Sequence, residues 1–90
     1  MTPVPRTLKE FYDLIRTIRM KLKRFGFHKW SQILYEDMVS GTTANEILGL
    51  LKQDLIRLDK SAIALLLCMR RDIRDALGFI DSGFRQNRFR

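Results

Sequence analysis

The sequence predicts an all-α protein with one domain, folded as a compact antiparallel bundle of four helices. Apolar residues recur at intervals of three and four, which is typical of helices that bury one face. Two capping boxes mark helix starts, and both prolines lie within the first five residues, where they interrupt no later helix. No segment alternates with a period of two. A chain of 90 residues forms one core rather than two.

The first predicted helix covers about residues 7–25. Thr7 and Glu10 have the spacing of a capping box, in which each side chain satisfies a free backbone N–H of the first turn. Gly26 is suited to the left-handed conformation that ends many helices. The residues expected on the buried face of this helix are Leu8, Phe11, Ile15, Ile18, Leu22 and Phe25.

The second and third helices are predicted at about residues 28–39 and 43–58. The second is only about three turns long, and the sequence leaves open whether it lies in the bundle or crosses it. Its apolar face comprises Phe27, Trp30, Leu34 and Met38, with Ile33 at the edge. The third begins at a second capping box, Thr43 to Glu46. Its expected buried residues are Ala44, Ile47, Leu48, Leu51, Leu55 and Leu58.

The fourth helix is predicted at about residues 61–82, with Gly83 as its end. Its expected buried face is Ile63, Leu66, Arg70, Ile73, Leu77 and Ile80. From Ile63 to Met69 the segment is apolar around most of its circumference, which favours a central helix and leaves coverage by a second copy, a homodimer, as the alternative. Residues 84–90 are expected to form a flexible basic tail beyond a domain spanning residues 1–83.

Two residues of the fourth helix stand out. Arg70 occupies a position where an apolar side chain is expected. The favoured interpretation is that its stem packs while its guanidinium reaches solvent; the alternative is a paired charge that fixes helix register or contacts a partner. Cys68 lies opposite the apolar face, and we expect it to be a small packed residue, because free cysteine is usually buried.

The net charge of +7 is concentrated in two parts of the chain. Residues 1–30 carry +6 and the last eight residues +3, whereas residues 31–58 carry −2 and residues 59–82 balance. Such asymmetry indicates a basic face rather than general basicity. The candidate binding residues on this face are Lys9, Arg16, Lys23, Arg24, Arg85, Arg88 and Arg90.

No motif for catalysis, metal binding or a cofactor is found, so the sequence does not predict an enzyme. His28 is the only histidine and has no orienting partner nearby, and one His with one Cys cannot form a metal site. A lone cysteine favours a reducing, cytoplasmic setting. The longest apolar run, Ala62 to Met69, has eight residues, whereas a membrane span needs roughly 20. No signal peptide is predicted.

The basic surface has three interpretations. It is a solvated face without a partner, a site for an acidic protein, or a site that contacts nucleic-acid phosphates. The leading functional hypothesis is a small binding module for a protein partner, in the manner of regulators, inhibitors and immunity proteins. Nucleic-acid binding is the alternative. The segment from Trp30 to Leu58 resembles small bacterial helical proteins of unassigned role, a resemblance that assigns no residue a function.

Overall fold

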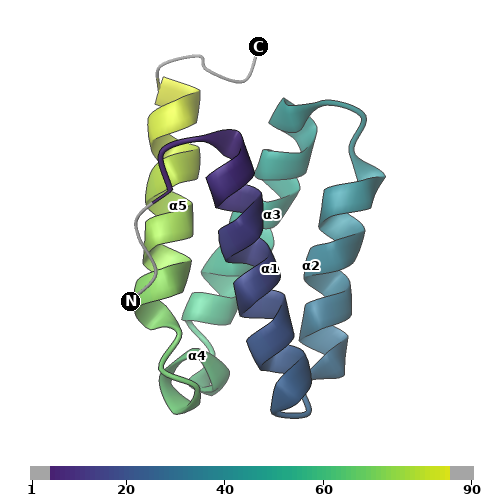
Figure 1. The fold of residues 1–90 in the computed structure, drawn as a ribbon, viewed down its shortest axis with the longest axis vertical. Helices are drawn as coiled ribbons and strands as arrows, with labels where there is room; N and C mark the ends of the chain where they lie inside the picture. Colours follow the sequence, from purple (N-terminus) through teal and green to yellow (C-terminus); the bar gives the residue numbers. More distant parts are fainter. Residues whose placement is uncertain (1–4, 86–90) are drawn as a thin grey trace.

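The computed structural model describes residues 5–85, with side chains through Phe84. Within this part the chain forms five helices and no strand: α1 (Leu8–Arg24), α2 (His28–Ser40), α3 (Ala44–Asp59), α4 (Ala62–Leu66) and α5 (Arg70–Arg85). Figure 1 shows the four long helices side by side in alternating directions, which confirms the all-α bundle. Helix α2 packs against both α1 and α3, so it belongs to the bundle rather than crossing it.

Both predicted capping boxes are confirmed as helix starts. The Thr7 hydroxyl accepts a hydrogen bond from the Glu10 backbone N–H at 3.1 Å, and the Thr43 hydroxyl accepts one from the Glu46 N–H at 3.2 Å. Each glutamate carboxylate in turn accepts from the N–H of the residue before the cap, one residue earlier than the standard box. The two helices that run in the same direction, α1 and α3, therefore begin at the same kind of cap.

The end of α1 at Gly26 is also as predicted. Gly26 has a φ of +90°, its N–H donates to the Lys23 carbonyl at 3.2 Å, and the Phe27 N–H donates to the Leu22 carbonyl at 2.8 Å. This pair of bonds is a Schellman motif. Phe25 is the residue at the turn itself, and it is exposed, so its predicted place on the buried face is wrong.

The predicted continuous helix over residues 61–82 is wrong, because the chain turns between Leu66 and Arg70. Cys68 has a φ of +54°, its N–H donates to the Leu65 carbonyl at 3.2 Å, and the Met69 N–H donates to the Ala64 carbonyl at 2.9 Å. This is the same motif as at Gly26, formed without glycine. Cys68 is exposed rather than packed.

The turn changes which residues of this segment are buried. Leu66 is exposed, whereas Leu67, Met69 and Phe79 lie in the core. The segment from Ile63 to Met69 is therefore neither a central helix nor a continuous apolar surface, since it forms the short α4 at one end of the bundle (Figure 1). Helix α5 also continues past Gly83 to Arg85, so the predicted tail begins later than residue 84.

The core lies between the four long helices. Its fully buried side chains come mostly from α1, α3 and α5, and the Phe11 and Phe79 rings stack with centroids 5.0 Å apart between α1 and α5. Helix α2 contributes Leu34, with Trp30 and Met38 partly buried. The buried residues of α1 and α3 are Phe11, Leu14, Ile15, Ile18, Leu22, Leu48, Leu51, Leu55 and Leu58, close to the predicted set. The core fixes one face of α1 inward and leaves the other in solvent.

Candidate binding surface on the first helix

Met20 lies at the centre of the solvent-facing side of α1. It is 65% exposed, although its helix buries five other apolar residues. Residues three and four positions away on a helix are its surface neighbours, so Arg16, Thr17, Lys23 and Arg24 surround Met20. The arrangement is an apolar side chain inside a ring of mostly cationic ones.

The cations around Met20 are free to interact outside the fold. Arg16, Lys23 and Arg24 are exposed, and none of them forms an ion pair with another residue in the part of the chain described here. Arg19, on the flank facing α2, is different: its Nε donates to the Ser31 carbonyl at 3.1 Å, and its guanidinium lies 4.7 Å from the Tyr35 ring centroid. Arg19 therefore holds α1 to α2, and the ring around Met20 is left for a partner.

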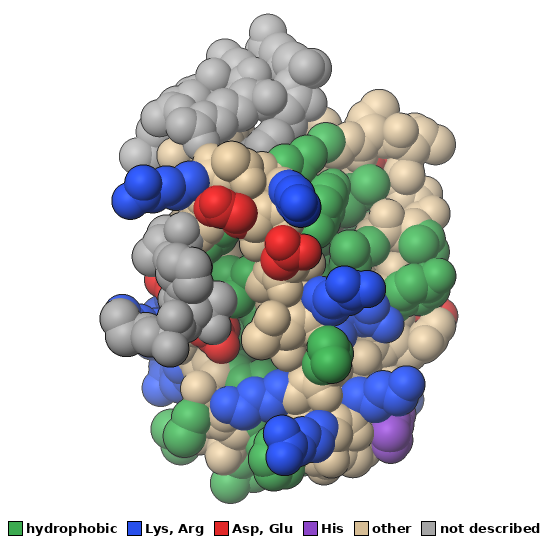
Figure 2. All heavy atoms as spheres, viewed as in Figure 1, with side chains coloured by type: hydrophobic (Ala, Val, Ile, Leu, Met, Phe, Trp, Pro, Cys, Tyr) green, Lys and Arg blue, Asp and Glu red, His purple; other side chains and the backbone are tan. Residues whose placement is uncertain are grey.

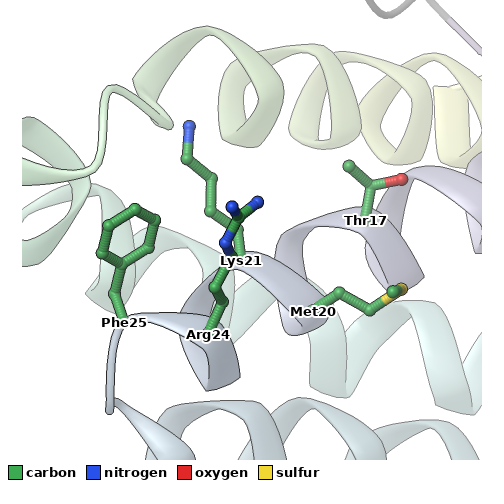
Figure 3. A pocket seen from close by; sticks show the side chains of 5 residues that line it. All are labelled: Thr17, Met20, Lys21, Arg24 and Phe25. Atoms are coloured by element: carbon green, nitrogen blue, oxygen red, sulfur yellow. The ribbon is translucent and has the colours of Figure 1, made fainter.

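A surface groove of about 650 Å³ runs beside Met20. It is lined by Thr17, Met20, Lys21, Arg24 and Phe25, all from α1 or its end (Figure 3). Figure 3 shows Lys21 and Phe25 pointing to the same side of the helix, toward α5. Lys21 and Phe25 are therefore additions to the predicted site. Phe25 was assigned to the core because its spacing fits the helical period, whereas its position after Arg24 places it in the turn.

The bundle gathers positive charge in one half. We call residues 17–33 and 53–77 the basic half; it contains the end of α1, the start of α2, α4 and the start of α5. It holds ten Lys and Arg against four Asp, a formal charge of +6. The opposite half, residues 5–16, 34–52 and 78–84, holds four cations against six carboxylates, a charge of −2. In Figure 2 the blue side chains gather across the lower part, around the end of α1.

The predicted basic residues do not form a single site. Lys9 is exposed on α1 but lies fifteen residues from Arg24, about 22 Å along the helix. Helix α5 ends where α1 begins (Figure 1), so the backbone of Arg85 is at the opposite end of the bundle from Arg24. Arg88 and Arg90 lie outside the described residues. The structure thus groups Arg16, Lys23 and Arg24 and separates them from Lys9 and Arg85.

Arg70 is the first residue of α5 rather than part of a continuous apolar face. It is exposed, and its Nε lies 3.8 Å from an Asp59 carboxylate oxygen at the end of α3. The distance makes this a weak ion pair between two neighbouring turns. Its placement in the buried face of the fourth helix is therefore wrong, because that placement required an unbroken helix.

Asp37 is a buried carboxyl group between α2 and α3, so the expectation that Glu36 and Asp37 form a surface pair is wrong for Asp37 and holds only for Glu36. It is only 9% exposed, and its Oδ2 has no hydrogen-bond partner among the described residues. Burial, a side-chain hydrogen bond with Asp54 and the negative charges of Asp54 and Glu36 together raise the pKa of Asp37 from 3.8 to about 7, against the opposing charge of Arg57. Arg57 itself pairs with Asp54 at 3.0 Å. Asp37 therefore titrates near neutral pH.

The described residues contain no group of three or more His, Cys, Asp or Glu side chains placed to hold a metal ion. Among them, no helix is both long and apolar enough to pass through a lipid bilayer. The chain matches no protein-family model, no curated protein and no solved structure. The function is therefore inferred from the exposed face of α1 and the charges around it.

Proposed function

We propose that this protein is a small non-enzymatic binding module that uses the outward face of α1 to bind an acidic surface on a partner protein. The observation that carries the proposal is Met20, which is 65% exposed at the centre of a ring formed by Arg16, Lys23 and Arg24. An apolar centre within a charged rim is the usual anatomy of a protein interface. The adjoining groove offers space for an apolar side chain of the partner.

The charge distribution supports an acidic partner. Within residues 5–84, a half that carries +6 lies beside a half that carries −2, and such asymmetry accelerates association with a negative surface and orients it. The mode of action that fits is occupation of the partner's surface, as regulators, inhibitors and immunity proteins do. The proposed location is the cytoplasm, where the lone thiol of Cys68 stays reduced.

Nucleic-acid binding is the alternative, and the same cations would serve it. Helix α3 follows the turn at Gly41 and is the element that would enter a duplex groove in a helix-turn-helix arrangement. Its two cations already pair with carboxylates of this chain, Lys52 with Asp81 at 2.8 Å and Arg57 with Asp54 at 3.0 Å. The structure thus favours protein binding over reading of a duplex sequence.

The test is affinity capture from an extract of the source cell with three baits: the wild type, Met20→Glu and Val39→Glu. Val39 is the control, since it is apolar, 59% exposed and in the opposite half; it shares a separate groove with Arg16 but does not line the groove beside Met20. We expect a protein that is retained by the wild type and by Val39→Glu but lost with Met20→Glu. Capture that does not distinguish the two variants would contradict the assignment of the site.

A gel-shift series over increasing salt separates the alternative. If the protein binds DNA or RNA, log affinity falls with log salt by about one unit for each phosphate contacted. A steep slope of this kind, together with no discriminating protein in the capture, would replace the protein-binding proposal by the nucleic-acid one. A protein complex with Met20 at its centre keeps more of its affinity, because its apolar contacts are not screened.

A further inference from the structure

The end of the bundle formed by α4 exposes large apolar side chains that the core does not use. Leu65 is 66% exposed and Leu66 is 71% exposed on α4, and Phe25 is 55% exposed at the end of α1. Figure 1 shows that α4 and the end of α1 lie at the same end of the molecule. The leucines of α1, α2 and α3 at core positions, by contrast, are almost fully buried. This end, which we call the α4 end, is therefore unusual within its own fold.

The α4 end is also costly for the protein to form. The turn after α4 places Cys68 at a φ of +54°, a conformation that costs a residue other than glycine about 1 kcal/mol or more. The same turn leaves Leu65 and Leu66 in water. Conflict between local preference and structure is most often retained at functional positions. The α4 end has the character of a surface that is built for contact.

Cations surround these apolar residues. Lys60 precedes α4, Arg70 follows it, and both line a shallow groove of about 340 Å³ beside Leu65. Asp59 also lines this groove, and its carboxylate lies 3.8 Å from the Arg70 guanidinium. Lys21 and Arg24 line the other groove at this end, together with Phe25. The exposed apolar residues of the α4 end therefore each have basic side chains beside them, within the half that carries +6.

We propose that the α4 end docks on the surface of a bilayer that contains anionic phospholipid. Leu65, Leu66 and Phe25 enter the boundary between headgroups and acyl chains, while the surrounding cations stay at the level of the phosphates. Charge complementarity identifies the partner as anionic. A bilayer fits better than a protein, because two adjacent leucines that are each about two-thirds exposed, beside Lys60 and Arg70, match the order of apolar chains beneath a layer of phosphates.

This inference goes beyond the proposed protein partner and does not rest on it. The long helices run along the longest axis of the molecule (Figure 1), so docking through the α4 end leaves the outward face of α1, with Met20, at the side of the bundle. The two sites share Lys21, Arg24 and Phe25 at the groove beside Met20, so occupation of one limits access to the other. The experiment below uses lipid vesicles and no protein partner, so its failure and the failure of the protein-binding proposal are distinguishable.

The first experiment uses the wild-type chain labelled at Cys68 with an environment-sensitive nitrobenzoxadiazole dye. Cys68 is the only cysteine in the sequence and is exposed in the turn beside α4. We expect a blue shift and brighter emission with phosphatidylcholine vesicles in which about one lipid in four is phosphatidylglycerol, and no change with phosphatidylcholine alone. No response to the anionic vesicles at low salt, or an equal response to both compositions, would overturn the proposal.

The second experiment measures co-sedimentation of unlabelled protein with the same vesicles. The variant Leu65→Gln/Leu66→Gln is compared with Val39→Gln, which removes an exposed apolar residue from the opposite half. We expect the double variant to lower the partition coefficient roughly tenfold or more, and Val39→Gln to leave it unchanged. Equal binding by all three proteins would show that charge alone holds them and would overturn the docking geometry. If the double variant loses its helical circular dichroism signal, the two single variants replace it.

Discussion

The two halves of the bundle contain parts of the same four long helices, yet they differ in the chemistry they present. The basic half carries +6 and exposes Met20, Phe25, Leu65 and Leu66; the opposite half carries −2 and exposes Tyr35, Val39 and Leu50. Neither difference follows the order of the chain, because each half combines segments from all of the long helices. The binding surface of such a bundle is therefore determined by which helix ends lie together. The following predictions test the difference in charge and exposed apolar residues between the two halves.

The largest expected effect concerns Asp37, in the opposite half. Its pKa of about 7 in the folded protein exceeds the ordinary value of 3.8, so folding favours the protonated carboxyl. The stability this confers is complete below about pH 4 and is lost as pH rises to about 7, after which it changes no further. Asp37→Asn stays neutral at every pH. We therefore expect its free energy of unfolding to exceed that of the wild type by roughly 2–4 kcal/mol at about pH 8 and to be nearly equal to it at about pH 4.

Urea unfolding at the two pH values, followed by circular dichroism, measures this difference. Ionisation of Asp37 also makes the opposite half more negative, so the charge contrast between the halves grows with pH. Parallel pH profiles for the wild type and Asp37→Asn would show that this carboxyl does not titrate near neutrality, and the contrast would then be fixed.

Charge reversal tests the contrast in binding. Lys23→Glu/Arg24→Glu lowers the net charge of the basic half by four units, and Arg6→Glu/Lys9→Glu makes the same change in the opposite half. We expect the first pair to weaken binding of the captured partner about 30-fold, equivalent to about 2 kcal/mol, because like charges then face each other across the interface. The second pair should alter it less than about threefold, since long-range charge is screened. Equal losses in calorimetric titrations would mean that net charge, not position, governs binding.

The two turns of the basic half allow a smaller and sharper test. Gly26 and Cys68 occupy the same left-handed position of the same motif, at φ of +90° and +54°. Cys68→Gly should therefore raise the free energy of unfolding by about 1 kcal/mol, and Gly26→Ala should lower it by about 1 kcal/mol. An added Cβ at Gly26 meets no atom within 4 Å, so the loss there reflects the backbone alone. Chemical denaturation measures both changes. A Cys68→Gly variant that is no more stable than the wild type would show that the positive φ of Cys68 costs the protein no stability.

These turns also show how far the sequence could predict the structure. The cap residues Thr7 and Thr43, the end at Gly26 and most of the apolar faces of α1 and α3 were predicted from spacing and turn chemistry alone. The break at Cys68 was not, because it forms without glycine or proline inside an apolar run that reads as continuous helix. That single miss also misplaced Leu66, Leu67 and Arg70.

The candidate site was also predicted only in part, but the reason differs from that for the fold. Periodicity correctly placed Arg16, Lys23 and Arg24 on the exposed side of α1. The separation of Lys9 from Arg24 follows from their spacing on one helix, but periodicity could not show that Arg85 lies at the end of the bundle away from Arg24, since that depends on the directions in which helices pack. Asp37 lies three residues after Leu34 and seven after Trp30, so its spacing was consistent with burial, but its raised pKa also depends on Asp54, seventeen residues away, which the sequence could not place beside it.

The smallest expected effect is at Arg70. Its guanidinium lies 3.8 Å from the Asp59 carboxylate, and a half-exposed pair at this distance contributes little. We expect Arg70→Leu to change the free energy of unfolding by less than about 0.5 kcal/mol. Thermal or urea unfolding measures it. A loss of several kcal/mol would assign Arg70 a structural role in holding α5 to α3.

Site-specific photo-crosslinking in the source cell tests the central claim most directly. A photoreactive amino acid replaces Met20 in one strain and Val39 in another, so the two halves of the same molecule are compared under identical conditions. We predict a discrete protein adduct from position 20 that is absent from position 39. Identical adducts from both positions, or an adduct with nucleic acid alone at position 20, would contradict the assignment of the outward face of α1 as a protein-binding surface.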